Sequence, residues 1–109
     1  MVKIAFDDEL QVLKCLFSGR LDIVGSSRDE EAIIGFIDQG APGRNNPPPA
    51  EFAVLFDLAE AEYISSAFLR LCLSLARHDR IREFSIVNSS PSARKVFSVA
   101  GLDRVLKIL

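Results

Sequence analysis

The chain has 109 residues, 49% of them hydrophobic, and carries a formal net charge of −2 at pH 7. This length suits one globular domain with a single core, so we expect residues 1–109 to form one domain. Lys and Arg are spread along the chain and leave no basic field, which argues against nucleic acid as a partner.

No apolar run approaches the roughly 18 residues that a membrane-spanning helix needs, and no signal-like leader is apparent. We therefore expect a cytoplasmic protein without membrane insertion. Its two cysteines, Cys15 and Cys72, lie far apart with no CxxC motif and no histidine cluster. This pattern favours buried free thiols, with a disulfide as the alternative, and indicates neither a metal site nor a cofactor.

The first third of the chain predicts a hairpin followed by a helix. Residues 2–6 alternate between apolar and polar, and residues 10–17 form a second strand that ends at Ser18-Gly19-Arg20. A helix capped by Ser26 or Ser27 is expected to follow, ending near Gly40. Residues 41–50 are rich in Pro, Gly and Asn and predict an exposed loop.

The rest of the chain alternates strands with helices. The apolar run 52–58 predicts a strand buried on both faces, and a long helix opens at Ser65 or Ser66 and ends near residues 77–79. A strand at 84–87, a helix at 92–99 and a last strand at 105–109 complete the order ββαβαβαβ. This order predicts an α/β domain with a mixed, mostly parallel sheet of about five strands and helices packed on it.

Three sequence segments in this order resemble the STAS domain family, which includes anti-sigma factor antagonists. They are FSGRLD at 17–22, FDLAEAEYISSAFLRLCLSLA at 56–76, and VNSSPSARKVFSVAGLDRVLKIL at 87–109. The resemblance implies a non-catalytic module that binds protein partners, often a serine-kinase anti-sigma factor. In regulated members a serine at the start of the central helix is phosphorylated, and the partner is released.

The family pattern at that serine reads roughly D-S-[STA]-G-L, and Ser66 occupies the acceptor position here. Ser65 replaces the usual Asp, Ala67 fits the pattern, and Phe68 replaces the usual Gly. A serine at a helix start also suits plain N-capping, so capping is the alternative role. A phosphate there would meet unpaired N–H groups and the positive end of the helix dipole, and Arg70 is placed one turn on to pair with it.

The helix after Ser66 carries two apolar stripes. We assign Leu69, Cys72, Leu73 and Ala76 to the sheet, which leaves a second stripe of Phe68, Leu71 and Leu75. Either a neighbouring helix covers the second stripe, or the stripe is a partner-binding or homodimer surface. STAS domains commonly add a helix after the last strand, whereas this chain stops at Leu109, so we expect a partner or second copy to supply cover.

Two functions follow. The first is an anti-sigma factor antagonist-like binding module switched by phosphorylation of Ser66. The alternative is an unphosphorylated STAS subunit of a transporter or signalling scaffold, favoured by the bulk of Phe68 beside the serine. No nucleophile–base set supports an enzyme, and His78 is expected only to complement a helix end.

Overall fold

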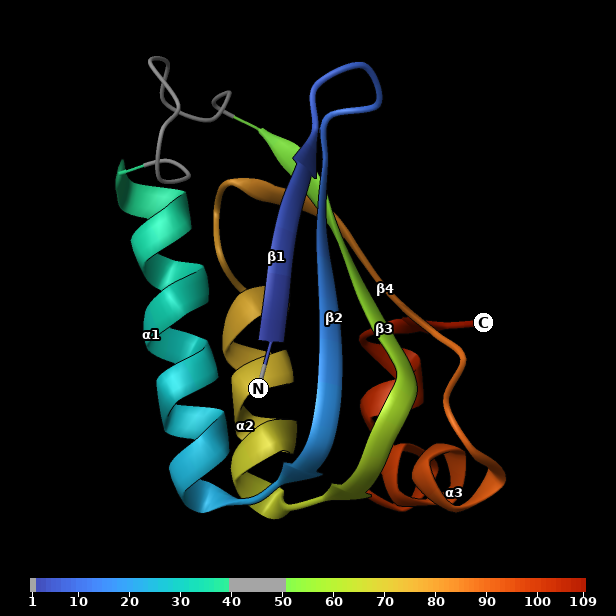
Figure 1. Ribbon diagram of the computed structural model, residues 1–109. Helices are drawn as coiled ribbons and strands as arrows, with labels where there is room; N and C mark the ends of the chain where they lie inside the picture. Colours follow the sequence, from blue (N-terminus) through green and yellow to red (C-terminus); the bar gives the residue numbers. More distant parts are fainter. Residues whose placement is uncertain (1, 40–50) are drawn as a thin grey trace.

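The structure, a computed structural model, describes residues 2–39 and 51–109 (Figure 1). Over these residues the element order confirms the predicted ββαβαβαβ, with one short 3-10 helix added. The predicted loop at 41–50 and the helix stop at Gly40 lie outside the described residues. The strands are β1 (Val2–Asp7), β2 (Val12–Leu21), β3 (Phe52–Ile64), β4 (Ile81–Val87) and β5 (Lys107–Ile108). The helices are α1 (Ile23–Gln39), α2 (Ser66–Ala76) and α3 (Pro91–Val99), and the 3-10 helix is η1 (Leu102–Arg104).

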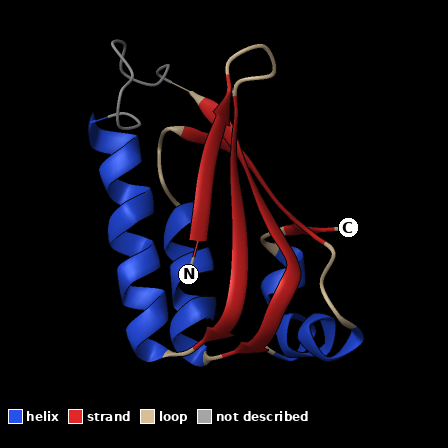
Figure 2. Ribbon diagram, viewed as in Figure 1, coloured by secondary structure: helices blue, strands red, loops and turns tan. Residues whose placement is uncertain are grey.

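In the described part of the chain the strands form one sheet in the order β1-β2-β3-β4-β5. β1 pairs with β2 antiparallel, and the other pairs are parallel, as predicted. Each parallel pair joins strands that are neighbours in sequence, and right-handed crossovers of this kind place their helices on one face. α1 and α2 lie side by side there (Figure 2). The opposite face carries exposed charges, including Lys3, Lys14 and Glu83.

β2 and β3 are both longer than predicted. The expected break at residues 18–20 is wrong, because Gly19 adopts a φ of 76° and the β2–β3 ladder absorbs two register shifts there. The ladder continues until Leu21 pairs with Ile64. Beyond Asp57, which pairs with Val87, β3 continues with β2 as its one partner among the described strands.

α1 begins at Ile23, four or five residues earlier than a cap at Ser26 or Ser27 predicts, and neither serine is its cap. The Asp22 carboxylate accepts a hydrogen bond from the Gly25 N–H at 2.8 Å, and the Asp22 carbonyl accepts one from the Ser26 N–H at 2.8 Å. Asp22 is therefore the capping residue, a role that its short acidic side chain suits.

The last third follows the prediction closely, except at the final strand. Ser90 caps α3 by accepting a hydrogen bond from the Ala93 N–H at 3.1 Å, and Pro91 occupies the first helical position. Gly101 then turns the chain with a φ of 76°. The predicted strand at 105–109 is reduced to Lys107–Ile108, because η1 and Leu106 are used to bury apolar side chains against the core.

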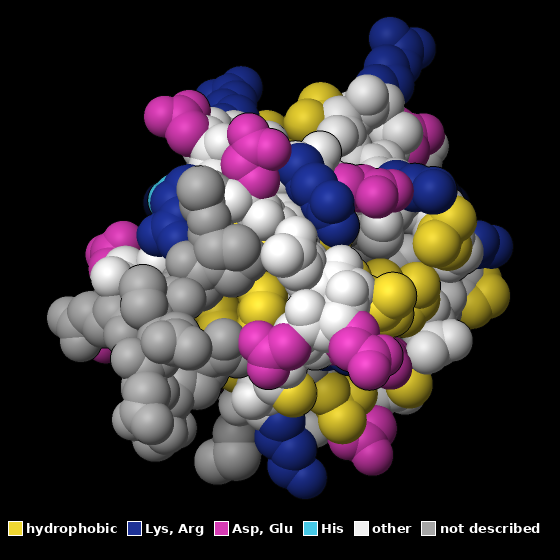
Figure 3. Space-filling view, turned by 90° about the horizontal axis from the view of Figure 1, so that it is seen from above, with side chains coloured by type: hydrophobic (Ala, Val, Ile, Leu, Met, Phe, Trp, Pro, Cys, Tyr) yellow, Lys and Arg dark blue, Asp and Glu magenta, His cyan; other side chains and the backbone are white. Residues whose placement is uncertain are grey.

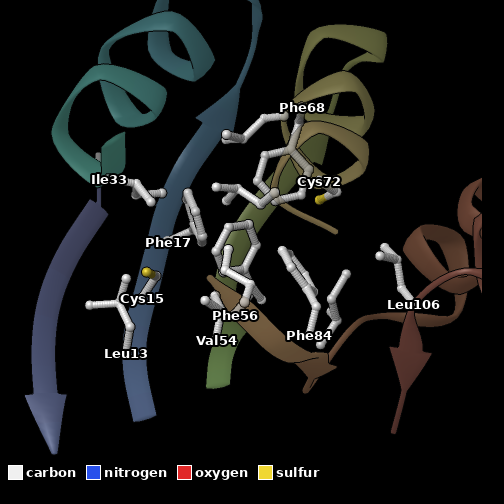
Figure 4. Packing of buried hydrophobic residues seen from close by; sticks show 14 of the residues in the cluster. Leu13, Cys15, Phe17, Ile33, Val54, Phe56, Phe68, Cys72, Phe84 and Leu106 are labelled. Atoms are coloured by element: carbon white, nitrogen blue, oxygen red, sulfur yellow. The ribbon is translucent and has the colours of Figure 1, made fainter. Parts of the chain in front are cut away.

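Phenylalanine rings form the centre of the core (Figure 4). Phe68 from α2 lies 5.1 Å from Phe17 and 5.9 Å from Phe56, measured between ring centroids. Phe68, Leu71 and Leu75 are all 0% exposed.

Of the two alternatives for the stripe of Phe68, Leu71 and Leu75, the exposed partner-binding or homodimer surface is therefore wrong. The stripe is covered, and α2 is rotated relative to the prediction, which placed the other stripe on the sheet. The bulkier stripe faces the sheet, because a phenylalanine ring gains most from the deepest site. Leu69, Leu73 and Ala76, which were assigned to the sheet, are only partly buried. Cys72 borders both stripes and is buried, as expected.

Replacing Phe68 by Ala tests this orientation. We expect Phe68→Ala to lower the free energy of unfolding by about 3–5 kcal/mol, because it leaves a cavity between two strands and a helix. Leu69→Ala, on the partly buried flank of the same helix, is expected to cost about 1 kcal/mol. Urea unfolding measures both, and equal losses in the two variants would contradict the orientation.

Two buried titratable side chains, Asp29 of α1 and Cys15 of β2, interact electrostatically. Asp29 is 4% exposed, and its Oδ2 atom has no hydrogen-bond partner among the residues that the structure describes. Burial raises the pKa of the Asp29 carboxyl. Burial, and then the Asp29 charge, raise the pKa of the Cys15 thiol. Both cysteines are buried free thiols, as predicted.

The raised pKa of Asp29 has a defined consequence for stability. The folded state favours the protonated acid, so this contribution is present below the ordinary pKa and is lost as the pH rises through the raised value. We expect Asp29→Asn to raise the free energy of unfolding at pH 7 and to lose that advantage below about pH 4. Urea unfolding at several pH values, with exposed Glu31→Gln as control, measures it; the same pH profile in both variants would contradict the expectation.

Candidate functional site

The predicted acceptor region lies where β3 ends and α2 begins. Ser65 is the N-cap of α2: its Oγ accepts a hydrogen bond from the Phe68 N–H at 3.3 Å. The same hydroxyl donates to the Leu21 carbonyl at 2.6 Å, and the side chain is 9% exposed. Both hydrogen-bonding directions of Ser65 are thus used within the fold.

Ser66 is the first residue of α2, and its side chain is exposed. Because the neighbouring Ser65 already provides the cap, the Ser66 hydroxyl is not needed for that role. The first turn of a helix presents backbone N–H groups without intrahelical acceptors, and its dipole favours a negative charge. The site therefore suits an added anion on Ser66.

The residues flanking Ser66 divide into a buried and an exposed set. Ala67 is partly buried, whereas Arg70, one turn further along α2, is exposed. Phe68 points into the core and not toward the serine. The expectation that its ring crowds the approach to Ser66 is therefore wrong.

The Leu21 carbonyl joins the start of α1 to the start of α2. It accepts hydrogen bonds from the Ser65 N–H at 3.1 Å, from the Ser65 Oγ, and from the Ser26 Oγ at 3.3 Å. As a result both helices start at the same end of the sheet (Figure 1).

This junction places large exposed apolar side chains near Ser66, which the sequence did not reveal. Ile23 and Val24, in the first turn of α1, are 68% and 62% exposed, and Tyr63, near the end of β3, is 46% exposed. The sequence does place the apolar pair Ile23-Val24 directly after Leu21-Asp22. The pair was not recognised as an exposed first helical turn because the helix was expected to begin later. We define the Ser66 surface as Ile23, Val24, Tyr63, Ser66 and Arg70.

Tyr63 is held in place from the neighbouring strand. The Arg20 guanidinium lies 4.5 Å from the centroid of the Tyr63 ring, in a cation–π contact. An aromatic ring fixed in this way loses little further freedom when a partner docks against it.

The opposite end of the molecule has a mixed surface. Figure 3 shows acidic, basic and apolar side chains interspersed there. The large exposed apolar side chains of the described residues form two groups, one on the Ser66 surface and one on α3 and the C-terminal segment (Val96, Val99, Val105 and Leu109), while Leu10 lies apart in the β1–β2 turn. Exposed apolar clusters of this kind mark contact sites.

The described residues contain no group of three or more His, Cys, Asp or Glu placed to hold a metal ion. Over the same residues no helix is both long enough and apolar enough to cross a membrane. His78 lies just after α2, and its Nδ1 accepts a hydrogen bond from the Arg80 N–H at 3.2 Å. This histidine helps to turn the chain from α2 into β4.

The sheet order and the helix start at Ser66 define an α/β domain with the STAS fold, and solved structures of anti-sigma factor antagonists share it. An anti-sigma factor antagonist from Mycobacterium paratuberculosis matches with a TM-score of 0.73 and 21% sequence identity, over 99% of this chain and 85% of that one. No protein-family model matches the sequence, and no curated protein does either.

SpoIIAA, an anti-sigma factor antagonist, also has this fold. Its unphosphorylated form matches with a TM-score of 0.65 and 18% identity, over 96% of this chain and 97% of that one. Its phosphorylated form, from Bacillus, matches with a TM-score of 0.67 and 18% identity, over 100% of this chain and 91% of that one. At these identities the likeness establishes the predicted fold.

The different roles of the two adjacent serines can be separated by substitution. We expect Ser65→Ala to lower the free energy of unfolding by about 2 kcal/mol, since it removes the helix cap and the bond to the Leu21 carbonyl. Ser66→Ala is expected to change it by less than about 0.5 kcal/mol. Urea unfolding compares the two, and an equal loss in Ser66→Ala would show that Ser66 is structural.

Proposed function

We propose that this protein is a non-catalytic protein–protein binding module that acts like an anti-sigma factor antagonist. Its docking site is the Ser66 surface, and its partner is a serine-kinase anti-sigma factor. The observation that carries the proposal is an exposed helix-start serine, free of the capping role, beside large exposed apolar side chains.

Phosphorylation of Ser66 is the switch in this proposal. The kinase transfers the terminal phosphoryl group of ATP to the Ser66 Oγ, the hydroxyl proton leaves, and ADP is released. The phosphate adds nearly two negative charges at the start of α2, where the helix dipole and Arg70 favour them. An apolar partner surface docked on Ile23 and Val24 would then have to desolvate that charge, so the complex dissociates.

Two comparisons are consistent with this assignment. Anti-sigma factor antagonists share the fold at nearly full length, and one of them, SpoIIAA, has a phosphorylated form. The alternative, an unphosphorylated STAS subunit of a transporter or scaffold, relied on Phe68 blocking the serine. Because Phe68 is buried in the core, it does not favour that alternative.

The switch is tested with the serine-kinase anti-sigma factors of the source organism. Incubation of each kinase with ATP and this protein, followed by mass spectrometry, is expected to place one phosphate on Ser66 and none on the buried Ser65. We expect Ser66→Asp to weaken the complex at least tenfold, with Ser66→Ala binding like the wild type. Phosphate elsewhere, or equal affinity of both variants, would contradict the switch.

The docking site is tested by a matched pair of charge insertions. Val24 and Leu10 are each 62% exposed, but Leu10 lies in the β1–β2 turn at the opposite end of the sheet. We expect Val24→Lys to weaken the kinase complex at least tenfold, because a desolvated charge replaces an apolar contact. Leu10→Lys is expected to leave the affinity unchanged, as measured by calorimetry. Similar losses in both variants would place the interface elsewhere.

A further inference from the structure

Among the described strands, none pairs with the β4 side of the last part of β3, so this edge is open there. The pairing of β3 with β4 ends where Asp57 meets Val87, while its pairing with β2 continues to Ile64. β4 then turns away toward α3, so the lower half of β3 has β2 on one side and α3 on the other (Figure 1). A strand edge of this kind presents backbone N–H and C=O groups to an incoming segment.

The direction of the backbone groups follows from hydrogen bonds along β3. The Phe52 N–H donates toward β4, to the Arg80 carbonyl, whereas the Ala53 N–H donates to the Gln11 carbonyl beside β2. At the other end, the Ser65 N–H again points to the β2 side, where it reaches Leu21. N–H groups of successive extended residues point in opposite directions, so that of Ile64 faces α3.

A groove of about 160 Å³ lies between this edge and α3. Its walls are mainly apolar, and its lining residues include Leu58, Ala61, Tyr63, Ile64, Ala93 and Val96. A cavity of about 150 Å³ with apolar walls can hold one benzene molecule. The groove therefore has room for one bulky apolar side chain.

The charge of the groove adds a second requirement. Among its lining residues Glu62 alone is charged at neutral pH, and it is exposed. The two serines at the start of α3 provide a polar rim, and Ser90 is already engaged as the α3 cap. A ligand that fills the groove thus gains from a positive charge next to its apolar group.

We propose that this groove binds an extended segment of a partner protein, which adds a strand to the open edge of β3. The segment inserts one leucine, isoleucine or phenylalanine between β3 and α3 and places a lysine or arginine against Glu62. Strand addition of this type takes affinity from main-chain hydrogen bonds and specificity from a side-chain pocket. This binding does not depend on phosphorylation of Ser66.

Selection from a phage library of random seven-residue peptides tests the proposal. We expect the enriched peptides to share one bulky apolar residue with a lysine or arginine one or two positions away. Synthetic copies of these peptides should shift the backbone amide NMR signals of residues 58–64 and of α3. No enrichment, or an enriched motif that is acidic, would overturn the proposal.

Three variants test whether the peptide binds in the groove. Ala61→Leu fills the groove and Glu62→Lys reverses its charge, so each should weaken the selected peptide at least tenfold. Glu60→Lys makes the same charge change on an exposed residue of β3 that does not line the groove, and should weaken it less than threefold. Thermal unfolding confirms that each variant is folded.

Two further outcomes count against the inference. Equal losses of peptide affinity in Glu62→Lys and Glu60→Lys would mean that binding depends only on the overall charge of this surface. A dimer seen by analytical ultracentrifugation without peptide, and lost in Ala61→Leu, would mean that a second copy occupies the groove. Val24→Lys, which tests the Ser66 surface, should leave the peptide affinity unchanged, so the two proposals can fail separately.

Discussion

The Leu21 carbonyl holds together the end of the domain that carries the candidate site. It accepts hydrogen bonds from the backbone and side chain of Ser65 and from the side chain of Ser26. These contacts fix the end of β2 against the starts of α1 and α2. Because Ser65 is fully engaged in this junction, the next residue can present its hydroxyl to solvent from a rigid base, and Ile23 and Val24 are held beside it.

The length of β3 has a second consequence. After Asp57, β3 extends past the end of its pairing with β4. This extension contains Tyr63 and leads into the start of α2. One side of the extension is completed by β2, while the other faces the groove beside α3. Tyr63 contributes to both the Ser66 surface and the groove, since it lines the groove and is also partly exposed. The two candidate binding regions are therefore adjacent but chemically different.

The sequence was sufficient for the element order and the parallel sheet, because alternating strand and helix patterns leave few topologies open. It also placed Ser66 at the start of α2. It failed where two equivalent patterns compete. Two apolar stripes on α2 have the same period, and only the fit of Phe68 between Phe17 and Phe56 decides which one is buried. The start of α1 was missed because Asp22 resembles a turn residue until Gly25 is seen to donate to it.

A phosphate on Ser66 would act on the surface of this protein and not on its fold. Ser66 is exposed and makes no contribution to the cap, whereas the hydroxyl that holds the helix start belongs to the buried Ser65. An added negative charge at the first helical position stabilises the helix, so it does not destabilise the fold. Its cost appears only when an apolar partner removes water from Ile23 and Val24. A fold arranged in this way can change affinity without changing shape.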